Sequence, residues 1–250
     1  MAARKKVIRA ALILSAAFLF LVGLTVLDFD TGLDVPLVSG ALIVAIALPS
    51  YYCFLRFAGV RKGVPLLLLL SAMPLLVEAQ AVVTSVPYGG FSYSDAMGPK
   101  LFGLVPWTVA FAYLPILLGS FTLASQLIGG RWTRMVMGSA AMLVLADLVL
   151  DPAIVHAGLW IWEDGGAYHG VPAVNFLGWL LTGVAYSAIL YFALKDRLES
   201  GEALPAGASS SLLLTMALWT GYVIQNGLLA PSVLGLALLA LLLLVNIKGR

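Results

Sequence analysis

Three acidic residues stand inside apolar stretches and are the side chains of this chain best suited to acid–base chemistry. Glu78 lies in LLVEAQAVV, and Asp147 and Asp151 lie in LADLVLDPAIV. Removal from water raises the pKa of a carboxyl group, so that it can keep a proton and donate it as a general acid. An ionisable group within a membrane is also costly and usually serves a function. The three residues are therefore the first candidates for a catalytic site.

The sequence around Asp151 permits two structures. Asp147 and Asp151 are four residues apart, which places them on one face if a single helix continues past both. Pro152 disfavours helical geometry at Asp151, however, and an Asp followed by Pro is also the expected start of a new short helix with the Asp as its cap. For Glu78 and Asp147 the alternative to catalysis is a buried acid satisfied by a neighbouring Ser, Thr or Tyr, or by a cation.

Polar and aromatic residues are expected at the same depth as these acids. Asn175 opens one apolar stretch, and Trp219, Tyr222 and Asn226 have the i, i+3, i+7 spacing of one helical face. This pattern favours a pocket with an aromatic wall and an amide rim. The alternative is an aromatic belt at the membrane interface together with ordinary helix packing.

Two long segments that are rich in Gly and aromatic residues, 85–103 and 156–170, are typical of lids or binding loops. They supply further candidates for completing a site: Tyr93, Asp95 and Tyr168. His156 and His169 lie in the second segment without a partner at metal-binding spacing. We therefore expect solvated histidines there and no metal site.

The elements that must position these residues are membrane helices. Of the 250 residues, 62% are hydrophobic and only 10% are charged, and the mean hydropathy is +1.03. About 20 helical residues cross a hydrocarbon core of roughly 30 Å, and apolar stretches of that length recur along the chain. We predict an all-α transmembrane bundle of about eight helices that forms a single integral membrane domain over residues 1–250, with spans at 7–27, 36–57, 64–84, 104–128, 134–151, 173–194, 209–228 and 232–247.

The basic residues predict the orientation of this bundle. Lys and Arg in short loops favour the cytoplasmic side, and with the amino terminus inside, every Lys and Arg except Lys100 falls at a cytoplasmic end. Both termini are then cytoplasmic in a multi-pass protein of the cell membrane, and Asp28, Asp30 and Asp34 fall in an outer loop. The last two spans are separated by only a few residues, so a single broken or re-entrant segment is the alternative there.

The middle of the chain carries a specific combination of motifs, namely VE, PYG, Y-x-D, GPK, D-x-x-x-DP and GVP-x-x-NF-x-GW, within residues 76–111 and 145–179. Through these motifs the chain resembles the family of carotenoid biosynthesis membrane proteins that contains the bisanhydrobacterioruberin hydratases and the gamma-carotene 1',2'-hydratases. The sequence departs from the family pattern at Ser85, where a Gly is expected, and at Tyr113, where a Trp is expected. Neither departure removes an acid, although both could alter the shape of a pocket.

The resemblance implies cofactor-free addition of water across the terminal double bond of an acyclic carotenoid end, as in bisanhydrobacterioruberin, lycopene or gamma-carotene. Proton transfer to C2 would leave a tertiary cation at C1, which aromatic faces can stabilise while a second carboxylate deprotonates the incoming water. We expect Asp147 or Glu78 as the proton donor, with the other, or Asp151, as the base and Asp95 as a second choice. The expected substrate-binding residues are Tyr93, Tyr168, Asn175, Trp179, Trp219, Tyr222 and Asn226.

Rival functions remain open on sequence alone. A carotenoid end-group cyclase or isomerase would begin with a similar protonation, and the mass of the product separates it from a hydratase. A non-catalytic carotenoid- or lipid-binding protein, or a transporter, would tolerate loss of the carboxylates. The expected partners are a hydrophobic carotenoid, the lipid bilayer and other carotenoid-biosynthesis enzymes. No cofactor and no nucleic acid is expected, because the chain has neither a glycine-rich nucleotide fingerprint nor metal-ligand spacing.

Overall fold

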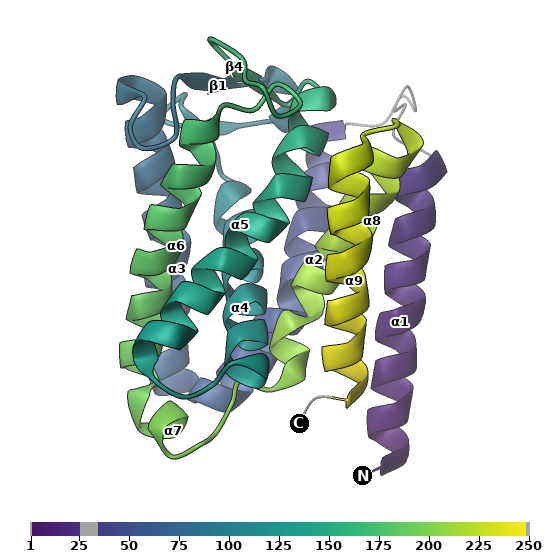
Figure 1. Ribbon diagram of the computed structural model, residues 1–250, viewed down its shortest axis with the longest axis vertical. Coiled ribbons are helices and arrows are strands. Elements are labelled where there is room, and N and C mark those ends of the chain that lie inside the picture. Colours follow the sequence, from purple (N-terminus) through teal and green to yellow (C-terminus); the bar gives the residue numbers. More distant parts are fainter. Residues whose placement is uncertain (1, 26–34, 249–250) are drawn as a thin grey trace.

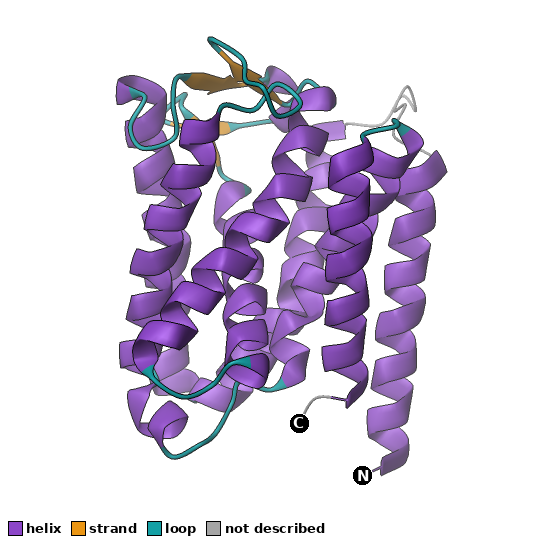
Figure 2. Ribbon diagram, in the orientation of Figure 1, coloured by secondary structure: helices purple, strands orange, loops and turns teal. Residues whose placement is uncertain are grey.

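The structure is a computed structural model that describes residues 2–25 and 35–248. In this part of the chain eight helices are long and apolar enough to cross a membrane, which confirms the predicted all-helical, multi-pass architecture (Figure 2). The helices are α1 (Ala2–Thr25), α2 (Val35–Ala58), α3 (Val60–Thr84), α4 (Val109–Leu127), α5 (Trp132–His156), α6 (Ala173–Ala193), the short α7 (Lys195–Glu199), α8 (Ser210–Gln225) and α9 (Leu229–Lys248). The predicted outer-loop acids Asp28, Asp30 and Asp34 lie outside the described residues.

The last two spans are separate helices, so the alternative of one broken segment is wrong. Gly227 has a positive φ of 69°, the left-handed conformation that commonly terminates a helix. The backbone N–H of Gly227 bonds to the carbonyl of Ile224, and that of Leu228 bonds to the carbonyl of Val223. Pro231 follows in the first turn of α9, where a missing N–H costs no helical hydrogen bond. The chain therefore reverses here, and α9 packs against α8 (Figure 1).

Helix α4 forms the centre of the bundle. It contacts α2, α3, α5, α6, α8 and α9. In the apolar stretch of α4, 78% of the residues are buried, against 17% in that of the peripheral α1. A helix that is apolar on all sides is expected in such a position. Helix α1 packs on α8 at the pair Gly23 and Gly221, where a β-carbon on either residue would meet the backbone of the other helix. Small residues of this kind let membrane helices approach closely.

A small cap covers one end of the bundle (Figure 1). Strand β1 (Phe91–Tyr93) pairs antiparallel with β4 (Trp160–Trp162), with Phe91 opposite Trp162 and Tyr93 opposite Trp160. A second pair joins β2 (Lys100–Leu101) to β3 (Val105–Pro106), and the 3-10 turn η1 (Asp95–Met97) lies between β1 and β2. Because β3 occupies residues 105–106, α4 begins later than the predicted residue 104.

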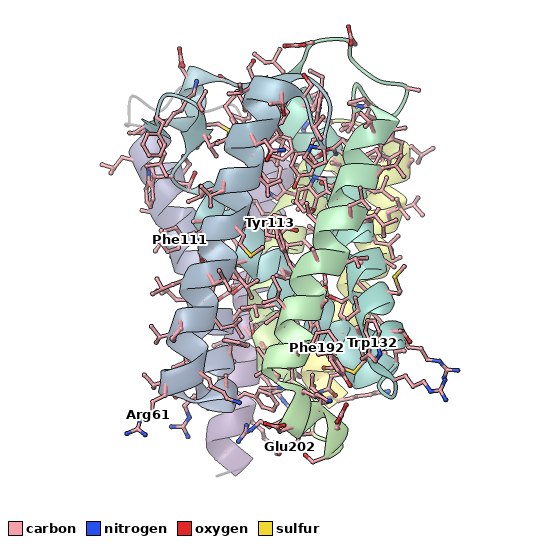
Figure 3. All side chains as sticks on the ribbon, turned by 90° about the vertical axis from the view of Figure 1, so that its left-hand side faces the viewer. Arg61, Phe111, Tyr113, Trp132, Phe192 and Glu202 are labelled. Carbon is pink, nitrogen blue, oxygen red and sulfur yellow. The ribbon has the colours of Figure 1, made fainter. Side chains whose placement is uncertain are left out.

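The opposite end of the bundle carries α7, the start of α1 and the end of α9 (Figure 1). Arg61 and Glu202 also lie at this end (Figure 3). The 3-10 turn η2 (Ala206–Ser209) leads from this end into α8. The predicted clustering of basic residues thus corresponds to one end of the bundle, and its assignment to the cytoplasm stays a prediction.

Candidate active site

Two aspartates of α5 and an asparagine of α6 form the most completely buried part of the site. Asp147 and Asp151 are both 0% exposed, and Asn175 is 1% exposed. The amide nitrogen Nδ2 of Asn175 donates to Oδ2 of Asp147 at 3.2 Å and also to Oδ2 of Asp151. The two carboxyl groups lie within hydrogen-bonding reach of each other. One amide therefore holds two carboxyl groups side by side, away from water.

Helix α5 continues through Pro152 to His156, so the interpretation of Asp151 as the cap of a new helix is wrong. Proline lacks an N–H, which leaves the carbonyl of the residue four positions earlier without its helical donor. That residue is Leu148, and its carbonyl accepts the hydroxyl of Tyr168 at 3.0 Å. A tyrosine from the 156–170 segment thus replaces the missing donor and lets the helix present Asp147 and Asp151 on one face.

Glu78 of α3 supplies the third acid. Its side chain is 5% exposed, and its Oε2 accepts the hydroxyl of Tyr93 from strand β1. Burial and the neighbouring Glu78 raise the pKa of Tyr93 well above its usual value, so Tyr93 remains a hydrogen-bond donor. Glu78 is close enough to Asp147 and Asp151 for its charge to act on both. The three acids predicted from sequence therefore belong to one cluster.

No basic side chain pairs with this cluster within the described residues. The ion pairs found in the described part of the chain lie elsewhere, namely Lys62–Asp196, Lys100–Asp95, Lys195–Glu199 and Arg197–Glu202. Oδ1 of Asp147 and Oδ1 of Asp151 have no hydrogen-bond donor in the described part of the chain. Nor do residues 2–25 and 35–248 contain a group of three His, Cys, Asp or Glu side chains arranged to hold a metal ion. The cluster is suited to holding and moving protons.

Aromatic rings pack into two groups, one in the cap and one within the bundle. In the cap, the rings of Phe91 and Trp162 have centroids 5.1 Å apart, and Tyr93 meets Trp160 edge-on at 5.8 Å. Within the bundle, Tyr113 of α4 packs on Trp179 of α6 at 5.0 Å and meets Tyr186 edge-on at 5.5 Å. The cap group reaches the acids through Tyr93, whose hydroxyl donates to Glu78. The faces of aromatic rings can stabilise a developing positive charge.

Several predicted site residues lie elsewhere. Asp95 is fully exposed, and the hydrogen bond and charge of Lys100, 2.8 Å away, lower the pKa of its carboxyl. The hydroxyl of Tyr168 donates a hydrogen bond to the carbonyl of Leu148, and its ring packs on Phe176.

Trp219, Tyr222 and Asn226 form a second group near the end of α8. The rings of Trp219 and Tyr222 meet edge-on at 5.6 Å, and Nδ2 of Asn226 donates to the backbone carbonyl of Tyr222 at 2.9 Å. The Tyr222 hydroxyl lies 2.9 Å from Nδ1 of His156. The structure thus brings Tyr93 to Glu78 and Asn175 to the aspartate pair. It packs Trp179 against Tyr113 and places the α8 group at a separate contact between α5 and α8.

Sequence reasoning missed Tyr88, Thr182 and Tyr186. The Tyr88 hydroxyl donates to Oγ1 of Thr182 at 3.3 Å, deep inside the bundle. A signal was present for two of them, because Thr182 and Tyr186 follow Asn175 at seven and eleven residues, on the same helical face. Tyr88 comes from the 85–103 segment, and no periodicity marks it.

An apolar groove of about 650 Å³ opens on the outside of the bundle beside α5. It is lined by Leu148, Tyr168, His169 and four residues of α9, namely Leu229, Ala230, Val233 and Leu234. Leu148 is the neighbour of Asp147 in the chain, so the groove borders the helix that carries two of the acids.

A family model described as "Carotenoid biosynthesis protein" matches residues 33–242. The chain is similar to a bisanhydrobacterioruberin hydratase of Haloarcula japonica, with 39% identity over 119 residues. The aligned part covers 46% of this chain and 40% of that protein. No solved structure was found to match.

Proposed function

The chain belongs to the carotenoid biosynthesis protein family, and we propose that it is a hydratase that adds water across the terminal carbon–carbon double bond of an acyclic carotenoid. The observation that carries this proposal is the buried cluster of Glu78, Asp147 and Asp151, which has no basic partner among the described residues. The similarity to a bisanhydrobacterioruberin hydratase supports the same class of reaction.

The aspartate pair is the proton donor in this proposal. Two adjacent carboxyl groups away from water cannot both be ionised at low cost, so one proton is shared between Asp147 and Asp151. Asn175 donates to Oδ2 of each group and leaves each Oδ1 without a donor. The shared proton is transferred to C2 of the terminal double bond. The electron pair of that double bond forms the new C–H bond, and C1 becomes a tertiary cation.

Glu78 is the base. A lone pair of the water oxygen forms the C–O bond at C1, and Glu78 accepts the proton that the water loses. The hydrogen bond from Tyr93 fixes the direction of the Glu78 carboxylate. The proton then returns from Glu78 to the aspartate pair, so the sum of the steps is the addition of one water. No electron acceptor is needed, because carbon gains H at one position and OH at the other.

The position of the cluster fits a carotenoid in the bilayer. A carotenoid is roughly as long as the hydrocarbon core is thick, about 30 Å, and a molecule that spans the core presents its end group near the interface. Glu78, Asp151 and Asn175 lie near the cap end of their helices. The apolar groove beside Leu148 offers a surface for the polyene chain that leads to this end.

The test is expression in a host that accumulates an acyclic carotenoid, followed by mass analysis of the extracted pigments. Addition of one water at one or both ends supports the proposal. A cyclic product of unchanged mass would assign the same acids to a cyclase, and unchanged pigment in the presence of correctly inserted protein would refute an enzymatic function on that substrate. The same host without the gene is the control.

A further inference from the structure

Two buried tyrosine hydroxyls on the inner side of the acid cluster have no role in the proton transfers described above. Tyr113 and Tyr186 are each 2% exposed, and their rings meet edge-on at 5.5 Å. Neither hydroxyl has a hydrogen-bond partner of ordinary geometry within residues 2–25 and 35–248. Buried polar groups in proteins are nearly always paired with a protein group or with ordered water.

Polar groups lie close to this pair of packed tyrosines. Thr182 lies beside the hydroxyl of Tyr113 and accepts the hydroxyl of Tyr88 at 3.3 Å, while its own hydroxyl donates to the carbonyl of Gly178 at 2.9 Å. The charge of Glu78 acts on both Tyr113 and Tyr186. A buried water molecule typically makes about three hydrogen bonds to such groups, and Tyr113, Tyr186 and Thr182 carry three hydroxyls on side chains that pack together.

The aspartate pair lies toward the cap. Asn175, which holds the pair, is in the first turn of α6, whereas Thr182 and Tyr186 lie two and three turns further into the bundle on the same helical face. Thr182 and Tyr186 therefore lie further from the cap than the amide that holds the aspartate pair. This separation would keep the added water away from the acid that forms the cation.

We propose that the hydroxyls of Tyr113 and Tyr186 hold the water molecule that is added to the carotenoid, within reach of Glu78. This inference rests on the proposed hydratase function and deepens it, because it assigns a site to the second substrate. The two tyrosines bind and orient water. They take no part in protonating the double bond.

The test uses Tyr113→Phe and Tyr186→Phe in membranes supplied with the acyclic carotenoid in D2O. Each substitution removes one hydroxyl and keeps the ring. Hydration is expected to fall about tenfold in each variant, the effect of one lost hydrogen bond. Deuterium should still enter the recovered, unhydrated carotenoid, because reversible transfer to C2 needs only the aspartate pair. The ratio of deuterium exchange to hydration is therefore expected to rise about tenfold.

Tyr191→Phe is the matched control. Tyr191 is on the same helix and 2% exposed, but its hydroxyl lies 3.5 Å from Glu199 at the opposite end of the bundle. The Tyr191→Phe substitution should leave the rates of hydration and of deuterium exchange unchanged. Wild-type hydration in Tyr186→Phe and Tyr113→Phe, or a parallel fall of hydration and exchange, would overturn the water site. A wild-type protein that forms no hydrate would instead refute the proposed function itself.

Discussion

The hydroxyl of Tyr93 donates a hydrogen bond to Oε2 of Glu78 and so joins the cap to the interior of the bundle. Tyr93 ends strand β1, and Nζ of Lys100 donates to its backbone carbonyl at 2.7 Å. The same Lys100 pairs with Asp95. Lys100 therefore holds the backbone of Tyr93, while the Tyr93 hydroxyl holds Glu78. The orientation of the Glu78 carboxylate thus depends on a strand outside the membrane helices.

Replacement of Asp147 by Asn or of Glu78 by Gln is expected to abolish hydration while the protein stays folded in the membrane. Both changes nearly preserve shape and remove an ionisable proton from the hydrocarbon. General acid–base catalysis commonly contributes about 10² to 10⁴ in rate, and the pigment analysis described above measures the loss. Asp196→Asn is the control, because Asp196 is an exposed residue of α7, at the end of the bundle opposite the cap. Near-normal hydration by both variants would count against the mechanism and direct attention to Asp95 and Tyr168.

Asp151→Asn is expected to fail with the other two variants. Asn caps a helix nearly as well as Asp, so a residue that only capped a helix would tolerate the change. Asp151 instead accepts the amide of Asn175 and lies beside Asp147. An amide there ends the sharing of a proton between two carboxyl groups. Retention of most activity at wild-type expression would show that Asp147 acts without Asp151.

Tyr168→Phe is expected to lower stability by about 1 kcal/mol, because the carbonyl of Leu148 loses its only side-chain donor in the described structure. Pro152→Ala supplies a backbone N–H at the position from which a helix normally bonds that carbonyl. Thermal unfolding of both single variants and of the double variant in detergent measures the coupling. The Tyr168→Phe loss should be smaller in the Pro152→Ala background, and equal losses in both backgrounds would contradict this account of the helix.

Ala230→Trp is expected to reduce conversion of a full-length carotenoid, because the larger side chain fills part of the groove beside Leu148. Leu236→Trp, at an exposed position of the same helix, is the control for expression and insertion. The yield of hydrated pigment at matched protein level is the measurement. Equal yields from the two variants would remove the groove from the substrate path.

The orientation of the bundle is tested by reporter fusions. A reporter placed after Lys195 should be cytoplasmic and one inserted near Gly165 should be external, because the basic residues belong to the segments at the α7 end of the bundle. The two sites lie at opposite ends of α6 in the structure. Reporters on the same side would contradict the eight-helix layout.

The eight membrane helices and the three central acids could be predicted from the sequence alone. Hydropathy is a local property, so each apolar stretch marks its own helix. Glu78, Asp147 and Asp151 were recognisable because a charged group is unfavourable in hydrocarbon wherever the helix lies. The spacing of Asp147 and Asp151 also predicted a shared face, provided that the helix continued.

Whether that helix continues, and which polar groups meet, depends on contacts between distant parts of the chain. Pro152 is compatible with either outcome locally, and the hydroxyl that replaces its missing N–H comes from Tyr168, in a segment that folds back over α5. Asp95 and Tyr93 are two residues apart, yet one faces solvent and the other contacts Glu78. Contacts of this kind depend on the packing of elements that are distant in sequence, and local periodicity carries no information about that packing.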